Sequence, residues 1–254
     1  MDLHEAADRN VAAALRHFAA HAAGATIVEK AAVLLVAAAT PFTGAFHNAA
    51  VRLDPGADPD STIEEVRSFS EQQGRDIILW ASTERDDDLI EAAVASGLRL
   101  RSATVGMATY EPPGLPVVSD SVELVRVADS TGVAGFGAVH ESLLGDASVV
   151  AHFASSGALL APEAAAFVVR VEGRPVACAM AVMSGSGAGV YWVATCTDFR
   201  RRGYGELATR AAVRAAFESG ARVVTLQSTE LGLPVYRRLG FVPFTSYARY
   251  LAQV

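Results

Sequence analysis

DFRRRGYGEL, residues 198–207, lies between a predicted strand over residues 190–195 and a predicted helix over residues 206–219. Glycine lets the backbone approach a ligand closely, and the N–H groups at a helix amino terminus attract anions with help from the helix dipole. The three arginines add charge-assisted hydrogen bonds. The pattern predicts a cradle for a pyrophosphate. The alternative is an ordinary strand-to-helix turn with a solvated basic edge.

Charge is distributed unevenly along the chain. The net charge is −7, yet residues 200–249 contain nine arginines and three acidic residues. Residues 1–116, in contrast, carry nine basic and 17 acidic side chains. A net acidic chain argues against a nucleic-acid partner held by a general basic surface. The local excess of arginine therefore favours a small polyanionic ligand.

The same glycines also fit the dinucleotide fingerprint G-x-G-x-x-A, from Gly203 to Ala208. A nicotinamide-binding unit has a parallel strand–helix–strand order and an acidic residue about 20 positions later. Here Glu230 follows Gly203 by 27 positions, and the segments before the motif have the pattern of antiparallel hairpins. The nicotinamide alternative is therefore disfavoured.

A second motif, PVYRRLGF, occupies residues 234–241. In the first motif, Arg200, Gly203 and Gly205 meet the pattern (Gln/Arg)-x-x-Gly-x-(Gly/Ala), and in the second Tyr236 precedes a Leu-Gly-Phe ending. Together they resemble the GNAT superfamily of acyl-CoA-dependent N-acyltransferases. The resemblance covers residues 122–251.

The resemblance implies a fold and a reaction. The fold is α/β of the α+β kind, with a mixed, mostly antiparallel sheet flanked by helices. The activity is that of an N-acetyltransferase, which moves an acetyl group from acetyl-CoA to a primary amine by direct attack on the thioester, without a metal. The acceptor is a small-molecule or peptide amine. The alternative is a regulatory acyl-CoA-binding module with little turnover.

Residue roles follow from the same resemblance. It implies that the pantetheine arm lies beside strand 190–195, and that the amides of residues 201–205 hold the pyrophosphate. Tyr236 corresponds to the general acid that protonates the departing thiolate; otherwise it is a packed aromatic residue with a satisfied hydroxyl. The implied donor-binding residues are Val193, Ala194, Thr195, Arg200, Arg201, Arg202, Gly203, Tyr204 and Gly205.

The sequence departs from the family in two places. Strand 189–195 carries no carboxylate, although a glutamate acting through water is common there. Residues 228–230, Ser-Thr-Glu, stand where an asparagine often precedes the tyrosine helix. The general base is therefore unassigned, and its candidates by residue type are His140, Glu141, His152, Asp198 and Glu230.

The first half resembles a degenerate copy of the same fold. A strand over 45–53, a helix over 62–73, a strand over 77–81 and a helix ending at Ser96 repeat the order of elements in the second half. The loop DPGADPD, residues 54–60, would repel a pyrophosphate. Ala93, four residues before a glycine, occupies the place of Tyr236.

These observations predict two GNAT-like domains. Residues 1–111 form a non-catalytic domain, residues 112–118 a proline-rich linker, and residues 119–254 the catalytic domain. In the first domain, Ser61 and Glu64 suggest a capping box. The carboxylates of residues 86–88 suit a helix amino terminus, and the acidic balance of this half suggests that it favours a cationic acceptor.

Several classes of protein and site are disfavoured. The longest apolar run, residues 31–39, is shorter than the ~20 residues needed to span a bilayer, and the start of the chain lacks a secretory pattern. We therefore expect a cytoplasmic protein with no membrane partner. Cys178 and Cys196 fit no disulfide or zinc pattern, so we expect buried thiols and no metal. The sequence leaves the oligomeric state open.

Overall fold

The computed structural model describes residues 2–30, 32–40 and 46–254 and has a mixed α/β fold, as predicted. Ala45, the predicted first residue of a strand, lies outside the described residues. The chain divides into two compact units. Unit 1 comprises Met1–Met107, Gln227–Leu231 and Pro243–Val254, and unit 2 comprises Ala108–Leu226 and Gly232–Val242.

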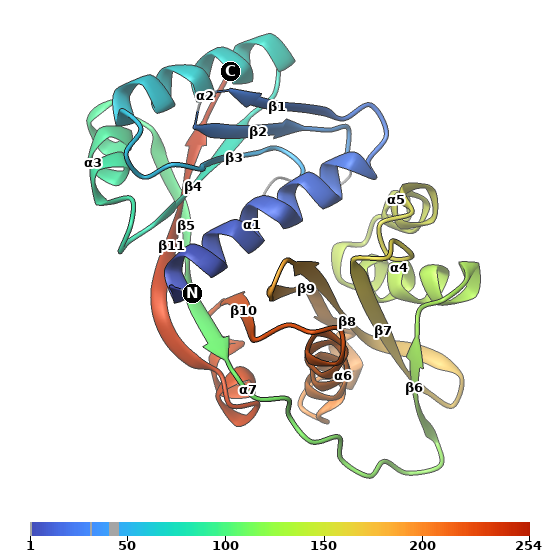
Figure 1. Ribbon diagram of the computed structural model, residues 1–254. Helices are drawn as coiled ribbons and strands as arrows, with labels where there is room; N and C mark the ends of the chain where they lie inside the picture. Colours follow the sequence, from blue (N-terminus) through green and yellow to red (C-terminus); the bar gives the residue numbers. More distant parts are fainter. Residues whose placement is uncertain (1, 31, 41–45) are drawn as a thin grey trace. The chain divides into compact units, whose positions relative to one another are not determined.

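These units differ from the predicted division into 1–111 and 119–254. Strand β11, Val242–Ala252, pairs antiparallel with β4, Ile77–Ser82, from Tyr247 opposite Ser82 to Ala252 opposite Ile77. The end of the chain therefore completes the sheet of unit 1 (Figure 1). The position of the proline-rich linker predicted a single boundary along the chain. It could not predict that the last strand pairs within unit 1, because order along the chain does not determine strand pairing.

Unit 1 is a sheet with the strand order β1-β2-β3-β4-β11-β5. The pairs β1–β2, β2–β3 and β4–β11 are antiparallel, whereas β3 and β4 run parallel and are joined by the crossover helix α2. The remaining elements are α1 Leu3–Ala20, β1 Thr26–Lys30, β2 Val33–Ala37, β3 Ala49–Arg52, α2 Pro59–Gln73, α3 Asp87–Ala95 and β5 Arg99–Thr109.

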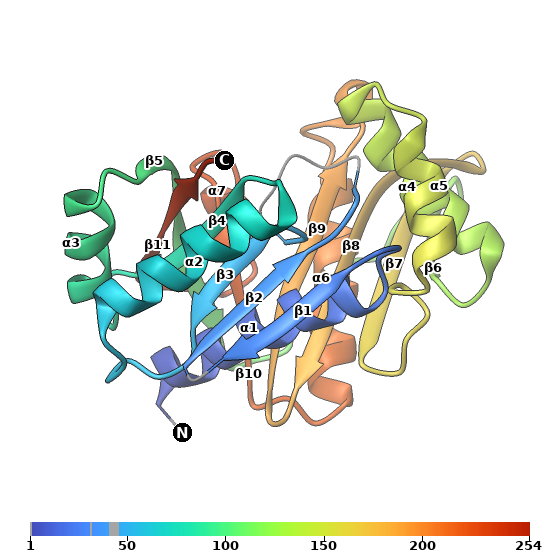
Figure 2. The same ribbon diagram turned by 90° about the horizontal axis from the view of Figure 1, so that it is seen from above.

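Helices cover both faces of this sheet (Figure 2). On one face, Val11 and Leu15 of α1 pack with Leu34 of β2 and with Trp80 of β4. On the other, apolar side chains of α2 and α3 pack against the alternate residues of the same strands, such as Leu35. Because both faces are covered, β2 and β4 are buried along their whole length, as expected for central strands.

Helix α2 begins earlier than the predicted capping box suggests. Pro59 is its first residue, and the Asp58 side chain accepts a hydrogen bond from the Ser61 N–H at 2.8 Å. Proline has no N–H and a fixed φ, which suit the first turn of a helix. The cap is therefore Asp58 and not Ser61.

A buried arginine joins the end of β3 to the amino terminus of α3. The Arg52 side chain is fully buried, and its guanidinium donates to Asp86 at 2.9 and 3.0 Å, to Asp88 at 2.7 and 2.9 Å, and to the Ala57 carbonyl at 3.0 Å. Two carboxylates of the acidic triplet therefore neutralise Arg52. Both carboxylates serve the fold of unit 1, and the single positive charge of Arg52 offsets one of the three negative charges that this triplet adds to the acidic balance of the first half.

Replacing Arg52 with alanine is expected to destabilise unit 1 by about 3–5 kcal/mol, because Asp86 would remain buried without a counter-charge. Hydrogen exchange at the amides of β4 measures this loss. Arg9→Ala is the matched control: it removes an exposed i,i+4 partner of Glu5, and such pairs contribute up to about 1 kcal/mol. Equal protection in the two variants would contradict a structural role for Arg52.

Asp8 of α1 is a carboxylate held in an unfavourable environment. Burial raises its pKa to about 6, and Asp86 adds to the rise, whereas a hydrogen bond from the Tyr247 hydroxyl at 2.8 Å and the charges of Arg85 and His4 oppose it. The folded chain therefore holds a proton on Asp8 at pH values where the unfolded chain has released it.

The difference between the pKa values of Asp8 in the folded and unfolded chain determines how stability changes with pH. Because the folded pKa lies above the ordinary value of 3.8, the free energy of unfolding should fall as the pH rises from about 4 to about 6. Asp8→Asn keeps an acceptor for Tyr247 and should flatten this slope, leaving the variant more stable than the wild type at pH 7. Urea unfolding across this pH range measures both quantities, and a less stable variant at pH 7 would contradict the interpretation.

Unit 2 contains the strand order β10-β9-β8-β7-β6, with α4 and α6 packed on opposite faces of the central strands (Figure 1). Among the described residues, no helix is both long and apolar enough to cross a bilayer. The elements are β6 Val122–Arg126, α4 Ser130–Leu144, α5 Ser148–Ser156, β7 Ala164–Val171, β8 Arg174–Ser184, β9 Gly187–Thr195, the 3-10 turn η1 Thr197–Phe199, α6 Tyr204–Glu218, β10 Val223–Ser228 and α7 Leu233–Arg238.

Candidate active site

Strands β9 and β10 of unit 2 pair over only part of their length. Their parallel ladder joins residues 187–189 to residues 223–225. Beyond this ladder, the rest of β9 up to Thr195 pairs with β8 and not with β10. The backbone of Val193, Ala194 and Thr195 therefore borders an opening at which an extended ligand can add itself as a strand.

A bulge in β9 lies at the start of this opening. The register with β8 shifts between Cys178 and Met180, and Trp192 has the left-handed φ of 53°. Such a conformation is strained for a residue with a side chain and persists only where packing enforces it. The Trp192 ring meets His140 edge-on, with 5.5 Å between ring centroids, and the Cys178 thiol points to the Trp192 carbonyl at 3.7 Å.

The loop after β9 contains two further left-handed residues, Arg201 with φ of 61° and Gly203 with φ of 82°. Gly203 is the N-cap of α6, and no side chain caps this helix. Helix α2 of unit 1, in contrast, is capped by Asp58. The first N–H groups of α6 are therefore left for another acceptor, and the helix dipole favours an anion there.

Gly205 allows α6 to approach β9. A Cβ atom at this position would lie 2.6 Å from the Thr195 Oγ1 atom, well inside van der Waals contact. The sequence motif thus combines two different uses of glycine. Gly203 supplies a positive φ, and Gly205 supplies space beside β9.

An ion-pair network connects α6 to α7 and to the linker. Glu206 accepts hydrogen bonds from Arg210 at 2.8 Å and from Arg238 at 2.9 Å, and Arg210 also donates to the Gly114 carbonyl at 2.8 Å. Burial alone would raise the pKa of Glu206, but the two arginines lower it below its ordinary value. Glu206 is therefore ionised at neutral pH and holds α7 beside the amino terminus of α6.

A cavity of about 340 Å³ lies between the linker and the amino terminus of α6. The linker supplies apolar side chains to its wall, α6 supplies its amino terminus and Arg210, and the loop before α6 supplies Arg202. The sequence alone gave no sign that the linker takes part. The lining residues are Pro116, Val117, Val118, Ser119, Val122, Arg202, Gly203, Tyr204, Glu206, Leu207 and Arg210.

Tyr236 lies in α7 and is partly exposed. Its ring meets Phe241 edge-on, with 6.1 Å between centroids, and no hydrogen bond to its hydroxyl is found among the described residues. Burial raises the pKa of Tyr236 to about 12. The phenol is therefore protonated at neutral pH, the state that a proton donor requires.

The candidate bases occupy different environments. Burial lowers the pKa of His140 to about 4, and its Nδ1 atom lies 3.2 Å from the Phe136 carbonyl and 3.6 Å from the Cys178 Sγ atom. Burial also lowers the pKa of His152 and raises that of Cys178. His140 and Cys178 therefore form a neutral, packed pair and not an activated nucleophile.

The three remaining candidates are carboxylates. Asp198 is exposed in η1, Glu141 is partly exposed in α4, and Glu230 belongs to unit 1. No hydrogen bond between Tyr236 and any candidate base is found in the described part of the chain. The base therefore remains unassigned by the contacts of unit 2.

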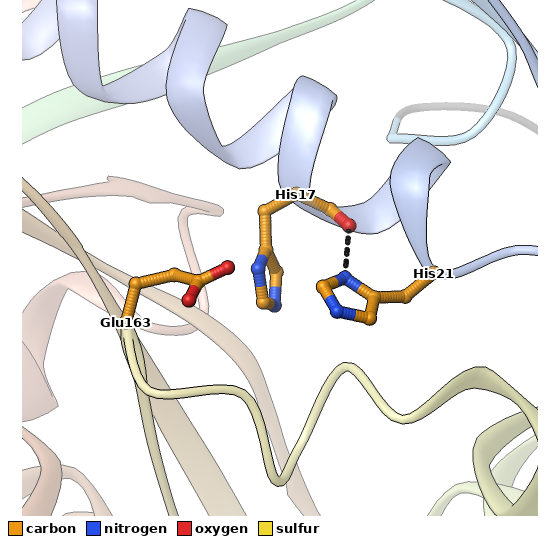
Figure 3. A group of neighbouring side chains, drawn as sticks. All are labelled: His17, His21 and Glu163. Carbon is orange, nitrogen blue, oxygen red and sulfur yellow. Dashed lines mark hydrogen bonds between the residues drawn. The ribbon is translucent and has the colours of Figure 1, made fainter.

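Two histidines at the carboxyl end of α1 are candidate metal ligands. His17 and His21 lie one helical turn apart, and the His21 Nδ1 atom lies 2.8 Å from the His17 carbonyl oxygen (Figure 3). Glu163, drawn with them, belongs to unit 2. Within unit 1, two histidines supply fewer than the three protein ligands of a usual zinc site, so the expectation of a chain without a metal stays a prediction.

Comparison with known proteins supports the assignment of the fold. Residues 137–241 match the model of a family described as acetyltransferase (GNAT) family. This range contains the opening along β9, the arginine–glycine loop and α7. No curated protein matches the chain.

Solved structures resemble nearly the whole chain. A GCN5-related N-acetyltransferase from Kribbella flavida is 21% identical, with a TM-score of 0.70 over 96% of this chain and 95% of that chain. One from Sphaerobacter thermophilus is 12% identical, with a TM-score of 0.63 over 87% and 80%. A tandem GNAT protein from the clavulanic acid biosynthesis pathway is 14% identical, with a TM-score of 0.62 over 96% and 95%. At these identities the similarity concerns the fold, and residues 137–241 of this chain are a domain of the GNAT acetyltransferase family.

Proposed function

We propose that unit 2 is an N-acetyltransferase that moves an acetyl group from acetyl-CoA to a primary amine. Its family and fold indicate an acyltransferase. One observation supports acetyl-CoA as the donor: the uncapped amino terminus of α6 follows the open edge of β9 through the short loop of residues 196–203. An extended donor with a diphosphate at one end suits this combination.

The site residues have distinct roles in this proposal. The backbone of Val193, Ala194 and Thr195 pairs with the extended arm of the donor. The diphosphate is held by the amides of residues 201–205 at the start of α6, with Arg200, Arg201 and Tyr204 around it, and Arg202 contacts another part of the same donor. The geometry that supports these roles is the left-handed loop with its exposed arginines.

The reaction requires one nucleophile and one proton donor. The neutral amine attacks the thioester carbonyl, forming a C–N bond and placing negative charge on the carbonyl oxygen, which backbone N–H groups of β9 stabilise. When the C–S bond breaks, Tyr236 donates its proton to the sulfur. The proton lost by the amine passes to a base that is not assigned, and the acceptor is a small-molecule or peptide amine.

We also propose that unit 1 is a non-catalytic copy of the same fold. Both units contain a parallel strand pair joined through a helix, β3-α2-β4 and β9-α6-β10. The helices that follow end alike: Leu98 N–H bonds to the Ala93 carbonyl at 2.9 Å, and Phe241 N–H to the Tyr236 carbonyl at 3.0 Å. Ala93 stands in the place of Tyr236, so this copy has no corresponding acid.

Thiol release from acetyl-CoA tests the function. The acceptor panel should include polyamines, amino acids, aminoglycosides and peptides with a free amino terminus. We expect at least one amine to stimulate thiol release, with a matching acetylated product seen by mass spectrometry. Tight acetyl-CoA binding without turnover on any acceptor would favour a regulatory acyl-CoA-binding module, an alternative supported by the lack of a carboxylate on β9.

A further inference from the structure

Two arginines from distant parts of unit 2 share one aromatic ring. The Arg174 guanidinium lies 5.2 Å from the centroid of the Phe199 ring, and the Arg202 guanidinium lies 5.3 Å from it. Arg202 belongs to the loop before α6, whereas Arg174 begins β8 after the β7–β8 turn. Cation–π contact with one ring holds both positive charges next to the proposed diphosphate site.

These charges are not neutralised within the protein. Arg174, Arg200, Arg201 and Arg202 are all exposed, and none of them forms an ion pair among the described residues. Arg210, Arg214 and Arg238, on the neighbouring helices, each pair with a glutamate. Two guanidinium groups held on one ring without a carboxylate repel each other, and an anion bound beside the ring lowers the energy of this arrangement.

The neighbourhood of this cluster suits a nucleotide. Arg202 also lines the 340 Å³ cavity, whose wall includes the apolar side chains of Val117, Val118 and Leu207. Apolar surface next to arginines and a helix amino terminus matches a group that combines a flat base with phosphates.

We infer that Arg174 and Arg202, positioned on Phe199, bind the phosphomonoester on the ribose of coenzyme A, and that Arg174 thereby makes the enzyme discriminate against a donor lacking this group. The inference rests on the proposed function. The helix amides and the loop suffice for the diphosphate, which leaves the cation pair for a second, more highly charged phosphate. Arg174 lies outside both sequence motifs, so the motifs alone would not assign it to the donor.

Calorimetry with coenzyme A and dephospho-coenzyme A tests this inference. The wild type should bind coenzyme A roughly 10- to 100-fold more tightly, the range expected for charge-assisted hydrogen bonds. Arg174→Ala should weaken coenzyme A binding toward the value for dephospho-coenzyme A and leave the latter unchanged. Arg174→Lys should keep part of the preference, because it keeps the charge and loses the planar fork.

Arg222→Ala is the matched control. Arg222 is exposed and precedes Val223, which pairs with Gly187 at the far end of β9 from Thr195, so both affinities should stay at wild-type values. Equal affinity of the wild type for the two ligands, or an unchanged ratio in Arg174→Ala, would overturn the inference while leaving the proposed function intact. Failure to bind either ligand would overturn both.

Discussion

Tyr236→Phe is expected to lower kcat by about 100-fold or more, with little change in the affinity for acetyl-CoA. The substitution removes only the hydroxyl, and the ring can still pack edge-on against Phe241. Without the phenol, the thiolate must leave unprotonated or take its proton from water. Because burial raises the pKa of Tyr236 to about 12, the wild-type rate should show no loss from its ionisation up to about pH 10.

The two effects are measured separately. Thiol release gives the rate of the chemical step, and calorimetry with coenzyme A gives the affinity for the donor. Tyr110→Phe is the control, because Tyr110 is 62% exposed in unit 2 and the change again removes one phenol. The control should keep the wild-type rate. A Tyr236→Phe variant within about threefold of the wild-type kcat would show that Tyr236 is a packed aromatic residue and not the acid.

Gly203→Asp is expected to abolish acetyl-CoA binding. No heavy atom lies within 4 Å of the position that a Cβ atom would take at Gly203, so steric conflict is not the cause. The new carboxylate would stand at the amino terminus of α6, where the diphosphate is proposed to bind. Two like charges about 4 Å apart at an effective dielectric of ~20 repel by about 4 kcal/mol, or roughly three orders of magnitude in affinity.

Gly203→Asn isolates the charge in this experiment. Asparagine has the shape of aspartate, and both tolerate the left-handed conformation that the φ of 82° requires. The Asn variant should therefore bind acetyl-CoA far more tightly than the Asp variant. Calorimetry should give one ligand per wild-type chain, since among the described residues only unit 2 has an uncapped helix beside an open strand. Retained affinity in Gly203→Asp would contradict the site.

Local sequence determined much of unit 2. The motif from Arg200 to Gly205 predicted a turn from a strand to a helix, because its glycines let the backbone approach a ligand closely, and α6 begins there at Tyr204. The tyrosine helix was predicted from its own short motif, and it forms at Leu233–Arg238. In unit 1, the predicted cap at Ser61 was wrong, because the proline at position 59 fits the first turn and moves the helix start earlier.

Tertiary structure alone decided the contacts between distant segments. Sequence carried no signal that β11 returns to β4, that Arg52 is buried between Asp86 and Asp88, or that Arg174 and Arg202 share Phe199. Motifs report what neighbouring residues must do, because backbone conformation and helix capping are local. Strand order, charge burial and shared aromatic rings depend on which surfaces meet after folding, and only the folded chain defines them.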